Sequence, residues 1–340
     1  MVATKSRGGL SVFSTVTLAS ALYLLLESVA FGQTHGSAKR LGILAVTVCP
    51  TAEAPLYWGP LLQNLRERGW VEGRTVMIDC LGANAQIDRV PALAEQLLAL
   101  HPDVVLGAAS PTIRALRQAT SLVPIVTASP DPLQDRFVDA LAHPGANITG
   151  LAPMSFELAA KRLELLKDLL PRLSRVALLS YGGIQQEIGQ QTIEKGMNAA
   201  AQKLGISWTS FFPNTADDID DAFARISAGG FDAAYVWATP FSLLYRKRIA
   251  EAALRHRVPT ISDNTEFARE GLLLTYGYDL GGVIGDAAEY IDKLFRGAKP
   301  ADLPLKQPTK FVLAVNVRTA SALGINVPSS VALRADELIE

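Results

Sequence analysis

The sequence predicts an α/β protein of two Rossmann-like lobes, each built on a parallel central sheet. From residue 40 onward, short apolar runs of β type alternate with amphipathic segments of helical period. The alternation starts afresh after a Pro/Gly break at Pro144 and Gly145. With 340 residues, the chain is also long for a single hydrophobic core.

The first half of the chain alternates strands and helices joined by short connections. Strands are expected at residues 41–48, 75–80, 103–106 and 123–126, and helices at 56–68, 90–100 and 110–118. The first strand is a continuous apolar run, as expected for a strand buried on both faces. Ser110 and Pro111 are a typical N-cap and first helical residue. Repeated units of this length predict a parallel sheet with helices on both faces.

The second half repeats this architecture after a short strand at 147–151 and a helix at 156–170. Strands are expected at 175–180, 207–212, 233–237 and 259–261, and helices at 185–204, 217–228 and 245–256. A strand at 271–276, a helix at 283–296 and a strand at 310–315 exceed what one lobe needs. They suit a chain that returns to the first lobe and then crosses once more.

The N-terminal 30 residues are predicted to be a secretory signal. Lys5 and Arg7 precede an uncharged run at 8–26, and Ser28 and Ala30 supply the small residues that a signal peptidase recognises. We expect cleavage after Ala30 and a periplasmic mature protein. The alternative is an uncleaved membrane anchor, because the apolar run is nearly long enough to span a bilayer. Polar residues within the run and Glu27 at its end favour cleavage.

Composition excludes several classes of function. There are 32 basic and 33 acidic residues, so the chain lacks the positive charge that binding to a nucleic-acid backbone requires. Cys49 and Cys80 fall at the ends of two strands expected to be neighbours, so they can pair in an oxidising compartment. The alternative is two unpaired small apolar residues. Two isolated cysteines do not supply the four clustered ligands of a structural zinc site.

Signatures of catalysis are missing from the sequence. No G-x-G-x-x-G follows the first strand, and neither a Walker-type loop nor a G-x-S-x-G elbow occurs. The four histidines lack a ligand-like partner or a carboxylate at triad-like spacing. Gly277, Gly281, Gly282 and Gly285 are interpreted as loop and helix-start glycines. The sequence therefore gives no support for an enzyme and none for a bound cofactor.

Small and hydroxyl-bearing residues follow several predicted strands, where open parallel sheets bind their ligands. Hydroxyls and free amides at helix N-termini suit a carboxylate, and Asp131 and Asp263 can meet an ammonium group. Aromatic residues at comparable strand ends can pack on an apolar or aromatic part of a ligand. The alternative is that the aspartates cap helices and the aromatic rings fill core edges. The predicted ligand-binding residues are Tyr57, Trp58, Ser110, Thr112, Ser129, Asp131, Tyr181, Trp237, Thr239, Asp263, Asn264 and Tyr276.

Short motifs spread over nearly the whole chain carry a family resemblance. They are 66–74 (RERGWVEGR), 123–126 (VPIV), 143–150 (HPGANITG), 161–167 (KRLELLK), 263–267 (DNTEF), 276–277 (YG), 307–311 (QPTKF) and 333–337 (LRADE). With these motifs in this order, the chain resembles the substrate-binding proteins of ABC transporters that have the type I periplasmic-binding fold. Better-known members of that family serve the import of tryptophan and related amino acids.

The resemblance implies two lobes joined by three hinge strands, a small ligand captured between them by closure, and delivery to a permease and its ATPase. It also implies a monomer without a cofactor or catalysis. The lobes are expected at 40–151 plus 276–303 and at 152–275 plus 304–340, with crossovers near 151–155, 275–278 and 304–307.

The loop after the third strand departs from the family pattern. It contains Ala108, Ala109 and Ser110, where relatives often have a glycine–threonine pair, so the resemblance does not carry over the ligand's identity. Two rival functions remain open. One is a periplasmic ligand sensor of the same fold, and the other is a two-lobed Rossmann-type enzyme such as a glycosyltransferase.

Overall fold

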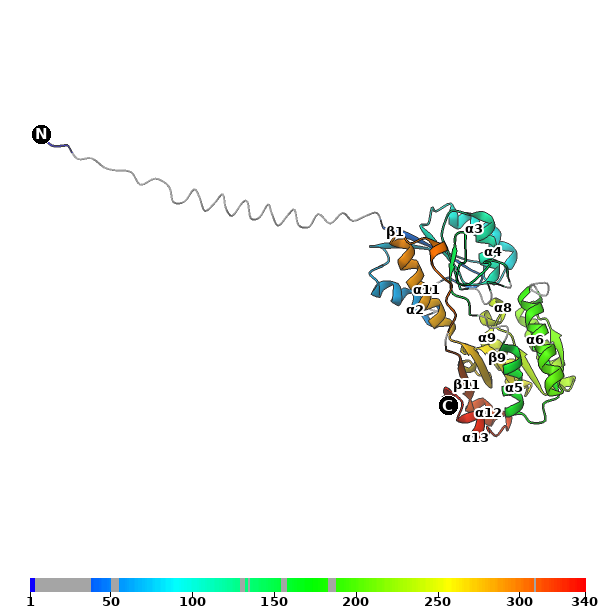
Figure 1. The fold of residues 1–340 in the computed structure, drawn as a ribbon. Coiled ribbons are helices and arrows are strands. Elements are labelled where there is room, and N and C mark those ends of the chain that lie inside the picture. The colour runs from blue at the N-terminus through cyan, green and yellow to red at the C-terminus, as the bar shows by residue number, and fades with distance from the viewer. Residues whose placement is uncertain are drawn as a thin grey trace. The chain divides into compact units, whose positions relative to one another are not determined.

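Two separate β-sheets organise the chain from Lys39 to Glu340 in the computed structural model (Figure 1). The structure describes residues 1–3, 38–49, 55–128, 132–133, 135–153, 158–182, 188–308 and 310–340. Both sheets are predominantly parallel, and helices cover both faces of each. The α/β class predicted from the sequence is therefore confirmed.

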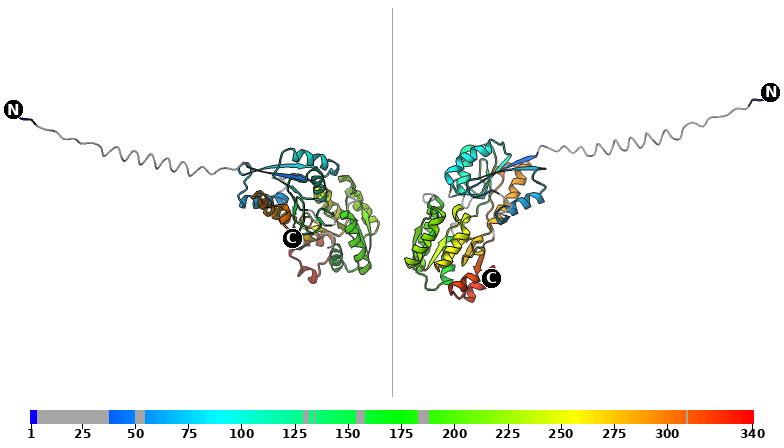
Figure 2. Two further views of the ribbon diagram at one scale, coloured as in Figure 1. Left: turned by 45° about the horizontal axis from the view of Figure 1, so that its top comes forward. Right: turned by 180° about the vertical axis from the view of Figure 1, so that it is seen from behind.

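The first sheet has the strand order β2-β1-β3-β4-β5, and all its strands are parallel. Its strands are β1 (Lys39–Ala45), β2 (Val76–Gly82), β3 (Val104–Gly107), β4 (Ile125–Thr127) and β5 (Ile148–Gly150). Helices α3 (Val90–Leu98) and α4 (Ser110–Ala119) pack on one face. Helices α2 (Pro55–Glu67) and α11 (Leu280–Phe295) pack on the other and lie side by side in every view (Figures 1 and 2).

The second sheet has the order β12-β11-β10-β9-β8-β6-β7, and only the β10–β11 pair is antiparallel. Its strands are β6 (Arg175–Leu179), β7 (Ser207–Phe211), β8 (Ala233–Val236), β9 (Thr260–Asn264), β10 (Leu274–Tyr278), β11 (Val312–Asn316) and β12 (Glu337–Ile339). Its helices are α5 (Ala159–Leu169), α6 (Ile188–Leu204), α7 (Ala216–Ala228), α8 (Pro240–Leu244), α9 (Arg246–Arg255), α10 (Glu266–Arg269), α12 (Val317–Leu323) and α13 (Ser329–Ala332). Helices α5 and α6 cover one face, and α7 and α9 cover the other.

The chain passes between the two sheets three times. It leaves the first sheet after β5, returns from β10 into α11, and leaves again after the short 3-10 helix at Pro300–Asp302 on its way to β11. The first and third passages are hydrogen-bonded to each other. Lys306 donates its amide to the Gly150 carbonyl, and Ala152 donates to the Lys306 carbonyl, both at 2.9 Å. These two passages therefore form a two-stranded connection rather than two independent linkers.

Several expected boundaries were wrong where polar residues occupy strands. The strand expected to end at residue 261 continues as β9 through Ser262, Asp263 and Asn264, all of them buried. An apolar-run criterion cannot detect these positions, because they are stabilised by partners distant in sequence. The helix expected at 245–256 is preceded by a separate short helix, α8, and the two meet at Tyr245.

The interpretation of the late glycines is confirmed for Gly281 and Gly282, which lie at a helix start, and wrong for Gly277, which lies in a strand rather than in a loop. Gly277 lies within β10, and Gly281, Gly282 and Gly285 lie within α11. A Cβ atom at Gly285 would lie 2.9 Å from the Cβ atom of Pro60 in α2. The small residue therefore lets α11 lie close against α2.

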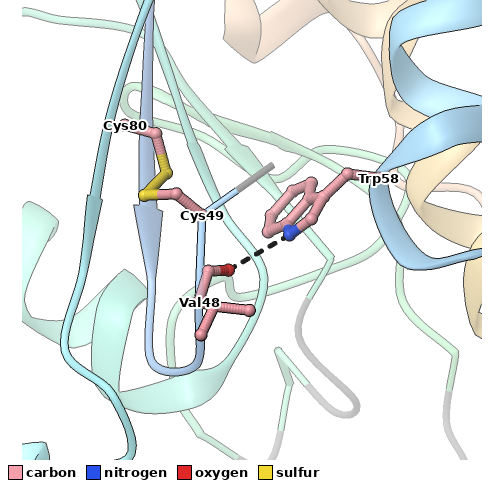
Figure 3. The surroundings of a disulfide bond; sticks show 4 residues. All are labelled: Val48, Cys49, Trp58 and Cys80. Atoms are coloured by element: carbon pink, nitrogen blue, oxygen red, sulfur yellow. Dashed lines mark hydrogen bonds between the residues drawn. A yellow bond between two sulfur atoms is a disulfide. The ribbon is translucent and has the colours of Figure 1, made fainter. Parts of the chain in front are cut away.

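A disulfide joins Cys49 to Cys80, which decides between the two alternatives that the sequence left open (Figure 3). Cys80 lies in β2, beside β1, and Cys49 follows β1, so the two Cα atoms are 5.8 Å apart. The carbonyl oxygen of Val48 accepts a hydrogen bond from the Trp58 indole at 3.2 Å. The disulfide therefore fixes the segment that contains Val48, whose carbonyl oxygen is hydrogen-bonded to the Trp58 indole.

We expect replacement of both cysteines by serine to lower the free energy of unfolding by about 3–4 kcal/mol. The bond joins residues 31 positions apart, and closing a loop of that length restricts the unfolded chain by this amount. Urea denaturation of the two proteins measures the difference. Dithiothreitol should lower the free energy of unfolding of the parent protein by the same amount as the double substitution does. It should leave the free energy of unfolding of the double variant unchanged. Equal stability of the oxidised parent and the variant would contradict the prediction.

Candidate ligand-binding site

The predicted site residues of the first lobe lie at the start of α4, directly after β3. The Thr112 hydroxyl donates to the Ala109 carbonyl at 2.7 Å and accepts from the Ala109 amide at 3.2 Å, so it stabilises this turn. Ser110 is partly exposed, and its hydroxyl donates to the Asp135 carboxylate. Ser110 is therefore partly exposed at the end of the first sheet, whereas Thr112 is buried.

The remaining predicted residues of this lobe fall into two groups. Trp58 is 1% exposed and belongs to the core between the first sheet, α2 and α11. The alternative that aromatic residues fill core edges thus describes Trp58 well. Tyr57 lies in α2, and Ser129 and Asp131 lie outside the described residues. Their role in binding stays a prediction.

In the second lobe, Asp263 connects the ends of two neighbouring strands. It is 5% exposed, and its carboxylate accepts a hydrogen bond from the Ala238 amide, just after β8, at 2.7 Å. The Asn264 side-chain oxygen accepts from the Glu266 amide at 2.9 Å and so turns the chain into α10. Thr239 caps α8 through the Ser242 amide at 3.1 Å. All three predicted polar residues are thus gathered at the carboxyl ends of β8 and β9.

Burial sets the protonation behaviour of Asp263. Removal from water raises the pKa of its carboxyl group, while the charge of Arg162 and the hydrogen bond from Ala238 oppose this rise. Arg162 itself is fully buried on α5. Burial also raises the pKa of the Tyr235 hydroxyl, which accepts a hydrogen bond from Arg162 at 2.9 Å. A cation, an acid and a phenol are therefore held together inside the second lobe.

A β-bulge lies next to Asp263. The register between β9 and β10 shifts so that Tyr276 and Gly277 together stand opposite Asp263. A Cβ atom at position 277 would collide with the Asp263 carbonyl oxygen, so this close approach requires glycine. Bulges of this kind are common next to functional sites, where they change the direction of a strand.

Two of the three predicted aromatic residues of this lobe follow strand ends, and the third, Tyr276, lies within β10. Tyr181, after β6, stacks on Phe241 of α8 with ring centroids 4.9 Å apart. Trp237, after β8, is 5% exposed. The ring centroid of Tyr276 in β10 lies 6.1 Å from that of Phe311, which precedes β11. The structure therefore places rings just after β6 and β8 and in the middle of β10, and β8 and β10 are the two strands that flank the strand bearing Asp263.

Sequence reasoning missed Arg162, Tyr235 and Phe241. Arg162 occupies the apolar face of α5 together with Leu166 and Leu169, at helical spacing. A charged residue in an apolar stripe was therefore the available signal. Tyr235 lay inside an apolar run, where nothing distinguished it from a core residue.

The protein has two mainly parallel sheets that are linked by three passages and have polar and aromatic residues near their carboxyl ends. This is the architecture of a type I periplasmic binding protein. The family of ABC transporter substrate binding proteins matches residues 55–339 of the sequence. The chain belongs to this family, and the resemblance inferred from the short motifs is confirmed.

Individual relatives agree with this assignment. A protein described as tyrosine-binding, from Clostridioides difficile (strain R20291), is 22% identical over 264 residues, covering 77% of this chain and 74% of that protein. A crystal structure of a conserved domain protein from Vibrio cholerae is 25% identical with a TM-score of 0.80, covering 89% of this chain and 100% of that one. An ABC domain from Streptococcus pneumoniae, solved in complex with L-Trp, is 25% identical with a TM-score of 0.78 and the same coverage.

We expect Gly277→Ala to lower the free energy of unfolding by about 1–3 kcal/mol, because the added methyl group forces β10 away from β9. Gly59→Ala is the matched control, since a Cβ atom at this helical position meets nothing within 4 Å. Urea denaturation of both variants measures the effect. If Gly277→Ala were as stable as the parent protein, the close approach of β10 to Asp263 would not require glycine at position 277.

Asp263→Asn should make the ligand-free protein more stable than the parent at neutral pH. The folded-state pKa of Asp263 is raised, so its contribution to stability is fully present below the unfolded pKa and is lost as pH rises through the folded value. The advantage of the neutral variant should therefore shrink as the pH falls. Melting temperatures recorded from pH 3 to pH 8 test this. A variant less stable than the parent at neutral pH would contradict the sign.

Proposed function

We propose that the protein captures an aromatic amino acid between its two lobes and presents it to an ABC permease and its ATPase. The observation that carries this proposal is the buried Asp263 carboxylate, with aromatic rings on the neighbouring strand β10 and after β6. A carboxylate attracts the ammonium group of an amino acid, and rings pack on an aromatic side chain. The tyrosine-binding relative and the L-Trp complex support the same class of ligand.

The two lobes offer complementary chemistry for such a ligand. At the start of α4, where the Ser110 hydroxyl donates to the Asp135 carboxylate, the N-terminus of the helix favours the ligand carboxylate. Asp263 in the other lobe favours the ammonium group. A ligand that contacts both lobes stabilises the closed arrangement over the open one, and the three passages serve as the hinge. Binding and release without a chemical step then account for the whole activity.

The proposal includes a place in the cell. We infer that residues 1–30 direct export and that the mature protein works as a periplasmic monomer. Within the described part of the chain, no helix has both the length and the apolar character needed to span a bilayer. The division into lobes at 40–151 plus 276–303 and at 152–275 plus 304–340 is part of the same proposal.

We expect Asp263→Ala to weaken the binding of L-tyrosine or L-tryptophan by at least about tenfold. A hydrogen bond to a charged group contributes about 1.5–3 kcal/mol, and 1.4 kcal/mol corresponds to a factor of ten. Isothermal titration calorimetry of the purified mature protein measures the change.

The matched control is Asp217→Ala, because this aspartate lies in the same lobe with a side chain that is 92% exposed. It should bind like the parent. If the parent protein binds neither amino acid, the proposed ligand class is wrong. If Asp263→Ala binds with unchanged affinity, Asp263 is not part of the binding site.

A further inference from the structure

Ile87 of the first lobe packs against the hydrophobic cores of both lobes. It begins a 3-10 helix, Ile87–Arg89, between β2 and α3. Its side chain is partly buried and packs against the first-lobe cluster formed mainly by the first sheet with α3 and α4. It also packs against the second-lobe cluster, whose buried members all come from residues 159–274 and 313–331. Ile87 is therefore a point of contact between the lobes.

A constrained turn determines the position of Ile87. Asn84 and Ala85, which precede it, both have left-handed backbones with φ of 52° and 64°. Residues other than glycine rarely adopt this conformation, and it persists where the surrounding structure holds it. Here the Ala85 amide donates to the Val46 carbonyl at 2.7 Å, and the Asn84 amide donates to the Thr47 carbonyl at 3.2 Å. The segment after β1 thus holds the turn, and the disulfide joins the same two segments.

A second apolar contact runs in the opposite direction. Leu243 lies in α8 of the second lobe and packs against the cluster that this lobe forms with α7 and α9. It also packs against the cluster formed by the first sheet, α2 and α11, which includes Leu151 and Tyr278 at two of the passages. Each lobe therefore places one partly buried aliphatic side chain against a cluster centred on the other lobe.

The contact made by Ile87 involves the same cluster as the aromatic residues predicted to bind the ligand. Trp237 is a buried member of the second-lobe cluster, and Tyr181 and Tyr276 pack against it. Ile87 thus reaches the hydrophobic cluster on which these rings are supported. An arrangement in which the lobes meet at Ile87 is therefore linked to the part of the second lobe where the rings are gathered.

We propose that Ile87 and Leu243 form an interlobe latch, which stabilises the closed arrangement of the two lobes and slows the release of a ligand. Apolar packing between two bodies joined by a hinge contributes only where the bodies meet, so it shifts the equilibrium toward that arrangement. Ligand release rests on the proposed function, whereas closure concerns the ligand-free protein as well. Both side chains act as positioning residues, through the lobes and not through contact with the ligand.

The separation of the lobes in the ligand-free protein tests the latch directly. Cysteines introduced at Met77 in β2 and Leu254 in α9 place one nitroxide label on each lobe, since these side chains are 48% and 42% exposed. The two native cysteines are paired with each other, so the introduced thiols alone react. Double electron–electron resonance then gives the distribution of distances between the labels.

We expect Ile87→Ala and Leu243→Ala each to shift this distribution toward longer distances, and Ile87→Asp to shift it further because a charge opposes apolar contact. If Ile87→Asp does not fold, the two alanine variants decide the question. Distributions that match the parent's in both alanine variants would overturn the proposal.

Two control variants separate closure from the stability of the first lobe. Leu98 of α3 packs against the same first-lobe cluster as Ile87 and is not among the described residues packed against the second-lobe cluster. Leu122 is 88% exposed. We expect Leu98→Ala to lower the melting temperature, Leu122→Ala to leave it unchanged, and neither to change the distance distribution. A shift in Leu98→Ala as large as that in Ile87→Ala would contradict the latch.

Ligand kinetics distinguish the failure of the latch from that of the proposed function. We expect Ile87→Ala to bind L-tyrosine at least about threefold more weakly, as for exposing about one methylene group, mainly through faster dissociation. If the parent binds neither L-tyrosine nor L-tryptophan but the distances shift as expected, only the proposed ligand is wrong. If the parent binds L-tyrosine and Ile87→Ala matches it in distances and dissociation rate, the latch is wrong and the proposed function stands.

Discussion

A carboxylate buried at the end of β9 is the constraint on which the arrangement of the second lobe depends. Burying an ionised group costs several kcal/mol unless hydrogen bonds and an opposite charge offset the loss of water. Here the Ala238 amide and the charge of Arg162 offset part of this cost, and burial still raises the pKa of the Asp263 carboxyl group. The bulge in β10, the glycine at position 277 and the hydroxyl of Tyr235 all lie around the same group. A fold that sought stability alone would place an apolar residue there, and the binding role proposed for Asp263 accounts for the acid at this position.

The described part of the first lobe brings together the Ser110 hydroxyl, the buried Asp135 carboxylate and the N-terminus of α4. Thr112 and the segment tied down by the Cys49–Cys80 disulfide keep the ends of β1 and β3 in place. The two lobes share one architecture, and each holds a buried aspartate, Asp135 in the first and Asp263 in the second.

The sequence predicted the architecture because alternating apolar runs and amphipathic helices are local features. It also located Asp263, Asn264 and Thr239 at strand ends, since ligands of parallel sheets bind there. It failed where a residue's state depends on distant partners. The polar end of β9 was assigned to a loop because its stabilising contacts come from β8 and α5. The bulge in β10 and the hydrogen bonds from Arg162 to Tyr276 and Tyr235 depend on contacts between segments far apart in the sequence, which no local pattern records.

A crystal structure of the mature protein grown with L-tyrosine tests the central claim most directly. The account predicts an unmodified amino acid bound between the lobes, with its ammonium nitrogen within hydrogen-bonding distance of the Asp263 carboxylate. An amino acid bound elsewhere, or one bound between the lobes with its ammonium group far from Asp263, would contradict it.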